Sequence, residues 1–126
     1  MSRRAKMVTV DEARRYVDAF NAADVAALSA LMAPGYRYTD RYAGGTLDAE
    51  RHLAVIADVH ARMPDRRISV EHVVTAARSQ IVEGEWSATT PTGVTLRTHV
   101  VIVFDVAEGL IVEGRAYYRE ADLAAP

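Results

Sequence analysis

The segment YRYTDRY, residues 36–42, places one carboxylate among three phenol rings. Its alternation predicts a β-strand, in which successive side chains point to opposite faces of a sheet. Tyr36, Tyr38, Asp40 and Tyr42 would then share one face, and the arginines would point away from it. Aromatic surroundings solvate a charged carboxylate poorly, so we expect Asp40 to be a stronger base than an exposed aspartate. A stronger base suits proton abstraction near neutral pH.

A structural role for Asp40 is the alternative interpretation. The residue stands near the predicted end of the strand, where it could cap the turn toward Gly44 and pair with Arg41. The residue types alone leave both interpretations open.

Metal and nucleophile chemistry find little support in the sequence. The four histidines are His52, His60, His72 and His99. His52 and His60 are about 12 Å apart along one predicted helix, too far for a single ion held at ~2 Å from each ligand. The chain has no nucleophile elbow and no glycine-rich phosphate loop. We therefore expect chemistry without a metal or a cofactor.

Composition narrows the class of protein further. The 15 basic and 17 acidic side chains give a net charge of −2, which offers no electrostatic case for nucleic acid or an anionic membrane as partner. Cysteine is absent, which excludes disulfides and thiolate sites. No window approaches the ~20 apolar residues of a membrane span, and no apolar run follows the basic start. A cytoplasmic protein is expected.

Helices are predicted in the first half of the chain. Apolar residues recur at helical spacing from Ala13 to Phe20, from Val25 to Met32 and over residues 46–63. Pro34-Gly35 and Pro64-Asp65 end the second and third helices. The 126 residues predict a single domain, with its core over about residues 9–119 and a loose tail over 120–126.

Strands are predicted in the second half. Alternation with period two extends over residues 67–77, 80–89, 94–106 and 110–119. The short connections predict antiparallel hairpins in one sheet. The fold class is therefore α+β, with three helices against one face of a curved four-stranded meander that also carries a short N-terminal strand. Such a face leaves a concavity in which a small molecule could bind.

Trp86 is predicted to point toward this concavity, because it shares a strand face with Val82, Gly84 and Ala88. Gly114, Ala116 and Tyr118 form a similar set of small and aromatic residues on the last strand. The periodicity does not tell a ligand contact from core packing. Val73, Ile111 and Tyr117 are expected on the outer face of the sheet.

The order helix, helix, short strand, helix and four-strand meander resembles the nuclear transport factor 2-like superfamily, which includes ketosteroid isomerases, SnoaL-like polyketide cyclases and limonene epoxide hydrolases. The likeness covers about residues 9–119. It is most pointed in RYVDAFNAADVAALSALMAPGYRYTD, residues 15–40, and continues in PTGVTLRTHVVIVFDVAEGLIVEGRAYY, residues 91–118. The resemblance implies a cone-shaped, cystatin-like fold and often a homodimer.

The resemblance also implies roles for individual residues. Asp40 falls where the isomerases have their general base, and Tyr16 where they have the phenol that donates to the oxyanion. Their second donor, a protonated aspartate, maps to Val101, which cannot donate. His99 lies two residues earlier on the same face and could replace it. Tyr38, Ile56, Trp86, Val101 and Tyr118 are the expected substrate-binding residues.

The implied activity is proton abstraction next to a carbonyl of a hydrophobic small molecule, leading to isomerisation or to ring closure as in a polyketide cyclase. An epoxide hydrolase is an alternative, and it would need Glu85 paired with Asp40 or His99. A non-catalytic, dimeric module that binds a small molecule is another.

Overall fold

The computed structural model describes residues 11–40 and 45–123. Arg41, Tyr42 and Gly44 lie outside the described residues. The described chain forms three α-helices, namely α1 (Glu12–Ala22), α2 (Val25–Leu31) and α3 (Ala49–Arg62). Its strands are β1 (Met32–Asp40), β2 (Gly45–Asp48), β3 (Arg67–Thr75), β4 (Ser79–Thr89), β5 (Thr95–Ala107) and β6 (Leu110–Tyr118), and a short 3₁₀ helix, η1 (Glu120–Leu123), follows them.

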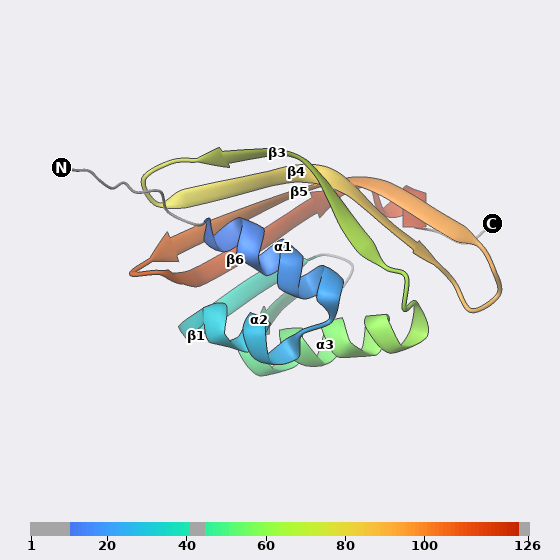
Figure 1. Ribbon diagram of the computed structural model, residues 1–126, viewed down its shortest axis with the longest axis horizontal. Coiled ribbons are helices and arrows are strands. Elements are labelled where there is room, and N and C mark those ends of the chain that lie inside the picture. Colours follow the sequence, from blue (N-terminus) through green and yellow to red (C-terminus); the bar gives the residue numbers. More distant parts are fainter. Residues whose placement is uncertain (1–10, 41–44, 124–126) are drawn as a thin grey trace.

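The six strands form one sheet in the order β2-β1-β6-β5-β4-β3. Strands β3 to β6 are the predicted antiparallel meander, whereas β1 pairs with β6 in parallel. The three helices lie together on one side of the curved sheet (Figure 1). The predicted α+β fold is thus confirmed. None of the described helices is long and apolar enough to cross a membrane.

Helix α1 buries the predicted stripe of Ala13, Tyr16, Val17 and Phe20. The helix is followed by its C-cap residue Ala23, which takes a left-handed conformation with φ of 57°. Helix α2 begins directly afterwards, where the Asp24 side chain accepts a hydrogen bond from the Ala27 N–H at 3.0 Å. This tight junction holds α1 over the sheet.

The third helix begins three residues later than predicted. Gly45–Asp48 form β2, which pairs with β1 so that Tyr38 lies opposite Leu47. The Asp48 side chain accepts from the Arg51 N–H at 2.9 Å, and this cap fixes the start of the helix at Ala49. A local cap therefore outweighs the apolar periodicity that extended the prediction back to residue 46.

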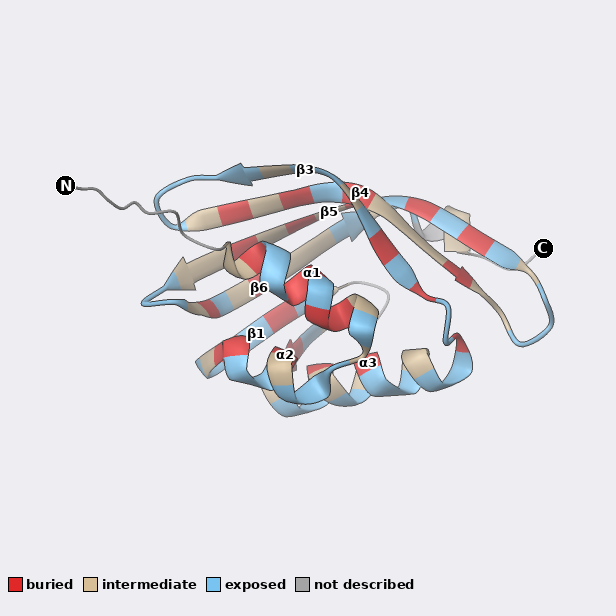
Figure 2. Ribbon diagram, in the orientation of Figure 1, coloured by how far each residue is buried: buried red, intermediate tan, exposed pale blue. Residues whose placement is uncertain are grey.

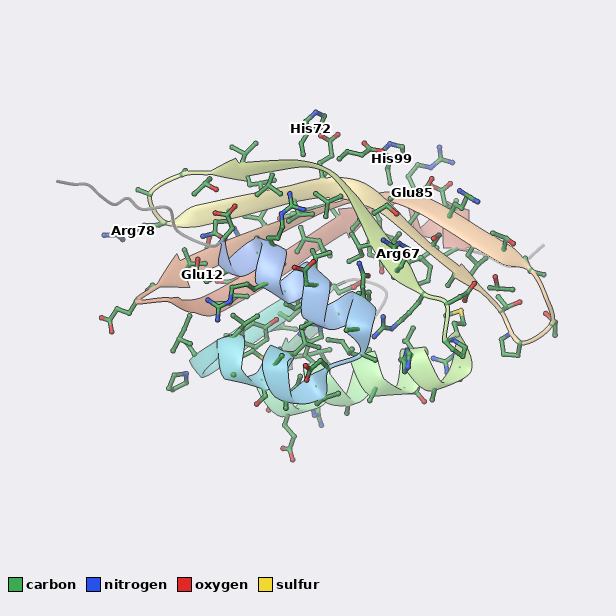
Figure 3. All side chains as sticks on the ribbon, viewed as in Figure 1. Glu12, Arg67, His72, Arg78, Glu85 and His99 are labelled. Carbon is green, nitrogen blue, oxygen red and sulfur yellow. The ribbon has the colours of Figure 1, made fainter. Side chains whose placement is uncertain are left out.

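Strand β5 presents the face opposite to the predicted one. The inward row is Leu96, Thr98, Val100, Ile102 and Phe104, all buried (Figure 2). His99 is exposed and points away from the helices (Figure 3), and Val101 shares that outer face. The reason is packing: Phe104 contacts the Tyr16 ring of α1 with ring centroids 4.9 Å apart.

The outer face of the sheet also differs from expectation. Ile111 is completely buried and Val73 packs against the core, so neither lies on this face as predicted. Tyr117 does, with 56% of its surface exposed, and Val74 is exposed to the same extent.

The predicted loose tail is ordered over its first four residues. Glu120–Leu123 form the 3₁₀ helix η1, and Leu123 packs against a small cluster of Met63, Ala88 and Leu96. Asp122 accepts a hydrogen bond from the Thr98 hydroxyl at 3.0 Å. The residues after 123 lie outside the described part of the chain.

Candidate active site

A cavity of about 460 Å³ lies between the helices and the inner face of the sheet. Its walls are mostly apolar and aromatic. Six of the residues predicted to act at a site line it, namely Tyr16, Tyr38, Asp40, Ile56, Trp86 and Tyr118. The other two, His99 and Val101, lie on the outer face of the sheet. Their placement in the pocket was wrong, and His99 cannot donate to a ligand in this cavity.

Asp40 stands at the end of β1 and receives a hydrogen bond on each carboxylate oxygen. The Tyr38 hydroxyl donates to Oδ2 at 3.2 Å, and the Tyr118 hydroxyl donates to Oδ1 at 2.5 Å. The parallel pairing of β1 with β6 brings Tyr118 to the carboxylate across 78 residues of sequence. Two phenols thus hold the acid in one orientation at the edge of an aromatic cavity.

A buried histidine that sequence reasoning did not assign to the site lies beside this group. His52 of α3 is 3% exposed, and its ring stacks on that of Tyr38 with centroids 3.7 Å apart. Its Nδ1 lies 2.8 Å from the Tyr36 hydroxyl oxygen, and its Nε2 lies 3.5 Å from that of Tyr16. Three tyrosines from two elements therefore surround one imidazole.

The helical spacing of α3 could have assigned His52 to the site. His52 and Ile56 are four residues apart on α3, so they share a helix face, and both border the cavity. From the sequence, His52 was weighed only as a metal ligand. Its role depends on the tyrosines of β1, which meet it only in the folded chain.

Burial sets the protonation states of this cluster. It lowers the pKa of His52 to about 3, so the imidazole is neutral at physiological pH. Burial also raises the pKa of Tyr16, Tyr36 and Tyr38. The three phenols keep their protons and act as hydrogen-bond donors.

Arg66 places a positive charge near the cluster. It is 2% exposed, stacks over the Phe20 ring at 3.9 Å and donates from Nη1 to the Phe20 carbonyl at 2.7 Å. The guanidinium therefore lies at the C-terminal end of α1, where the helix dipole favours a cation. Burial lowers its pKa. Its charge opposes the effect of burial on the pKa of Tyr16 and so favours a hydrogen bond from that phenol to an anion.

The inner face of β4 has the predicted orientation. Val82, Gly84 and Ala88 are buried, and Trp86 is partly buried and borders the cavity. Glu85 lies on the opposite face and pairs with Arg97 at 3.2 Å (Figure 3). Neither pair that epoxide hydrolysis would require borders the cavity. Glu85 lies across the sheet from Asp40, and His99, its cross-strand neighbour, shares the outer face with it.

A group of possible metal ligands lies outside the lining of the cavity. The ligand atoms of Glu71, His72 and Glu83 are within 4.8 Å of one another, and all three residues are exposed. His72 points outward from β3 (Figure 3), and its Nδ1 lies 3.1 Å from the Glu83 carboxylate. The hydrogen bond between His72 and Glu83 accounts for the approach of these two exposed side chains.

Comparison with known proteins identifies the family of this chain and solved structures that share its fold. A family model described as a SnoaL-like domain matches residues 13–114. No protein of curated function matches the sequence.

Solved structures with the same fold cover most of the chain. IdmH from Streptomyces antibioticus, named as a candidate polyketide cyclase, has a TM-score of 0.80 at 23% identity and covers 91% of this chain and 97% of its own. A candidate SnoaL-like polyketide cyclase from Shewanella denitrificans has a TM-score of 0.79 at 13% identity, with 89% and 90% covered. A protein from Catenulispora acidiphila has a ketosteroid isomerase-like fold and is in complex with trimethylamine. Its TM-score is 0.79 at 16% sequence identity, and the match covers 88% of this chain and 87% of that protein.

Proposed function

This chain belongs to the SnoaL-like family, and we propose that it is a cofactor-independent acid–base enzyme acting on a hydrophobic small molecule. The observation that carries the proposal is that Asp40 and Tyr16, an acid and a phenol, border one largely apolar cavity. A base and a hydrogen-bond donor in a shared dry site are what abstraction of a proton next to a carbonyl needs.

In the proposed reaction, an Asp40 oxygen takes a proton from the carbon next to the substrate carbonyl. The electron pair of that C–H bond moves into the carbonyl, and the resulting enolate oxygen accepts a hydrogen bond from the Tyr16 hydroxyl. Return of the proton to another carbon gives an isomer. Attack of the enolate carbon on a second carbonyl closes a ring, and Asp40 then protonates the new alkoxide.

The test measures proton abstraction itself, so that the natural substrate need not be known. In D₂O, the protein should accelerate exchange of deuterium into the carbon next to the carbonyl of 2-tetralone, followed by NMR. Asp40→Asn should lower that rate by roughly a hundred-fold or more, as expected for loss of a general base. It should leave the melting temperature nearly unchanged, because the amide oxygen accepts from one of the two phenols and the amide N–H can donate to the oxygen of the other.

His99→Ala is the matched control, since His99 is exposed on the outer face. It should keep the full rate of exchange. Retention of the rate in Asp40→Asn, or loss of it in His99→Ala, would overturn the proposed mechanism.

Binding of an organic cation without turnover is a second candidate function. One carboxylate in a cavity also lined by the rings of Tyr38, Tyr118 and Trp86 is suited to an amine, and a protein of the same fold is in complex with trimethylamine. Trp86 is the only tryptophan, so its fluorescence reports on the cavity. Saturable quenching by trimethylammonium, absent in Asp40→Asn, together with no deuterium exchange in the wild type, would favour this function.

We also propose that the outer face of the sheet forms a homodimer. Val74 and Tyr117 are exposed there among charges of both signs, including Glu85, Arg97 and Arg115. A face that carries both signs can complement itself across a two-fold axis. Light scattering after size exclusion should give a dimer for the wild type and a monomer for Tyr117→Glu. Val25→Glu, at an exposed apolar position on α2, is the control and should leave the dimer intact.

A further inference from the structure

The hydrogen bonds around His52 select one tautomer of its ring. A neutral imidazole has one N–H donor and one acceptor nitrogen. Its two nitrogens face two hydroxyls, Nδ1 toward Tyr36 at 2.8 Å and Nε2 toward Tyr16 at 3.5 Å. Either Nδ1 carries the proton and donates to Tyr36, or Nε2 carries it and donates to Tyr16.

Tyr36 distinguishes the two tautomers. Its side chain is 2% exposed, and among the described residues its hydroxyl has a hydrogen-bond partner only in His52 Nδ1. If Nδ1 carried the proton, the Tyr36 O–H would have no acceptor in the core, at a cost of about 1–3 kcal/mol. If Nδ1 accepts, the Tyr36 O–H is satisfied, and the ring proton lies on Nε2.

We propose that His52 is a positioning residue that, as the Nε2–H tautomer, donates to the Tyr16 oxygen and thereby directs the Tyr16 O–H into the cavity. The inference rests on the proposed function, in which Tyr16 donates to an enolate. All donors in the chain Tyr36, His52 and Tyr16 then point the same way, toward the ligand.

This series of hydrogen bonds strengthens the bond from Tyr16 to the ligand and does not deliver a proton to it. Proton transfer to the ligand along this chain would leave the negative charge on Tyr36, and burial raises the pKa of that phenol far above its ordinary value. Aligned hydrogen bonds polarise one another in a low-dielectric interior. The 3.5 Å distance from Nε2 to Tyr16 leaves room for this bond to shorten when charge develops on the ligand oxygen. The stack on Tyr38 fixes the plane of the ring while it does so.

The tautomer can be measured without any substrate. A ¹⁵N-histidine sample of the His60→Gln, His72→Gln, His99→Gln variant contains only His52, and long-range ¹H–¹⁵N spectra at neutral pH show which nitrogen is protonated. A protonated Nε2 with an unprotonated Nδ1 is expected. A protonated Nδ1 would overturn the proposal.

A double-mutant cycle tests whether His52 acts through Tyr16. The probe is 4-nitrophenolate, which carries its charge on a phenol oxygen as an enolate does. The cycle uses the Asp40→Asn protein, in which a neutral side chain replaces the carboxylate. His52→Phe keeps an aromatic ring against Tyr38 and should weaken binding roughly ten-fold, the usual worth of one hydrogen bond. In Tyr16→Phe the same change should have less than about a two-fold effect.

An equal loss in both backgrounds would mean that His52 acts only on packing, and the proposal would fail. If Tyr16→Phe itself leaves probe affinity unchanged, Tyr16 is not the donor and the proposed function is at fault. The tautomer measurement still decides the assignment at His52 in that case, and it needs no substitution in the cluster.

Discussion

Gly114 of β6 lies opposite Tyr38 of β1 in the parallel part of the sheet, and the missing side chain makes room for the tyrosine ring. A Cβ atom built at Gly114 would be 3.1 Å from Tyr38 Cδ1. The same ring stacks on His52 and donates its hydroxyl hydrogen to Asp40. A glycine on one strand thus sets the position of a ring that contacts both the imidazole and the acid.

Gly114→Ala should therefore displace the Tyr38 ring by a few tenths of an ångström. We expect a loss of about 1–3 kcal/mol in the free energy of unfolding, as for other overpacked cores, and a several-fold slower exchange reaction. Urea titration measures the free energy of unfolding. In a Tyr38→Ala protein the same glycine substitution should cost much less, and an unchanged cost would contradict this account.

Gly84→Ala should be more harmful than Gly114→Ala. Its Cβ would lie 2.2 Å from the Ser69 carbonyl oxygen and 3.2 Å from Val70 Cα, so the obstacle is the backbone of β3 and not a movable side chain. We expect a destabilisation of about 3 kcal/mol or more, with loss of pairing between β3 and β4. Amide exchange of β3, measured by NMR, would report that loss. A loss in the free energy of unfolding no greater than that of Gly114→Ala would show that the backbone of β3 can move to make room.

Tyr118→Phe should loosen Asp40 without unfolding the chain. It removes the 2.5 Å hydrogen bond to Oδ1 and leaves the ring in place. We expect the exchange rate to fall by roughly ten-fold, because a carboxylate held by only one of its two phenols is aligned less precisely with the substrate carbon. Tyr117→Phe is the control, because Tyr117 is the adjacent tyrosine on the outer face and is 56% exposed. Similar losses in both variants would contradict the assigned role.

The stability of the protein should fall in acid in a way that depends on His52. Its pKa is lowered by burial from 6.5, the ordinary value for an exposed histidine, to about 3 in the folded chain. Between these values the unfolded chain binds a proton that the native chain does not, so stability decreases as pH falls below about 6.5, by up to ~1.4 kcal/mol per pH unit. Urea titrations at several pH values should show a shallower dependence for His52→Phe. Identical slopes would mean that His52 is not buried in the neutral form.

The sequence predicted the face of β1 because the alternation there is unambiguous. Tyr36, Tyr38 and Asp40 turn inward as expected, and Arg37 is exposed. On β5 the inner face was taken from the family resemblance, which maps Val101 into the pocket, and this choice was wrong. The row from Leu96 to Phe104 is the more continuously apolar one, and it is the row that the structure buries against α1.

The order of the three helices and of β1 and β3 to β6 was also predictable, but β2 was not, because its residues were taken as the start of the third helix. The contacts within the cavity were not predictable. Periodicity places Tyr118 and Trp86 on inward faces, but it says nothing of which acid a phenol will reach. The bonds of Tyr118 to Asp40 and of Tyr36 to His52 arise from the curvature and register of the folded sheet.

The parallel pairing of β1 and β6 has a consequence for how the site comes into being. During synthesis Asp40 leaves the ribosome long before Tyr118, and nothing local can bring the two together. Closing so long a loop is slow relative to forming hairpins such as β4–β5. The acid therefore acquires its second phenol among the late events of folding, and a nascent chain that has made its helices and hairpins still lacks this contact until β1 and β6 pair.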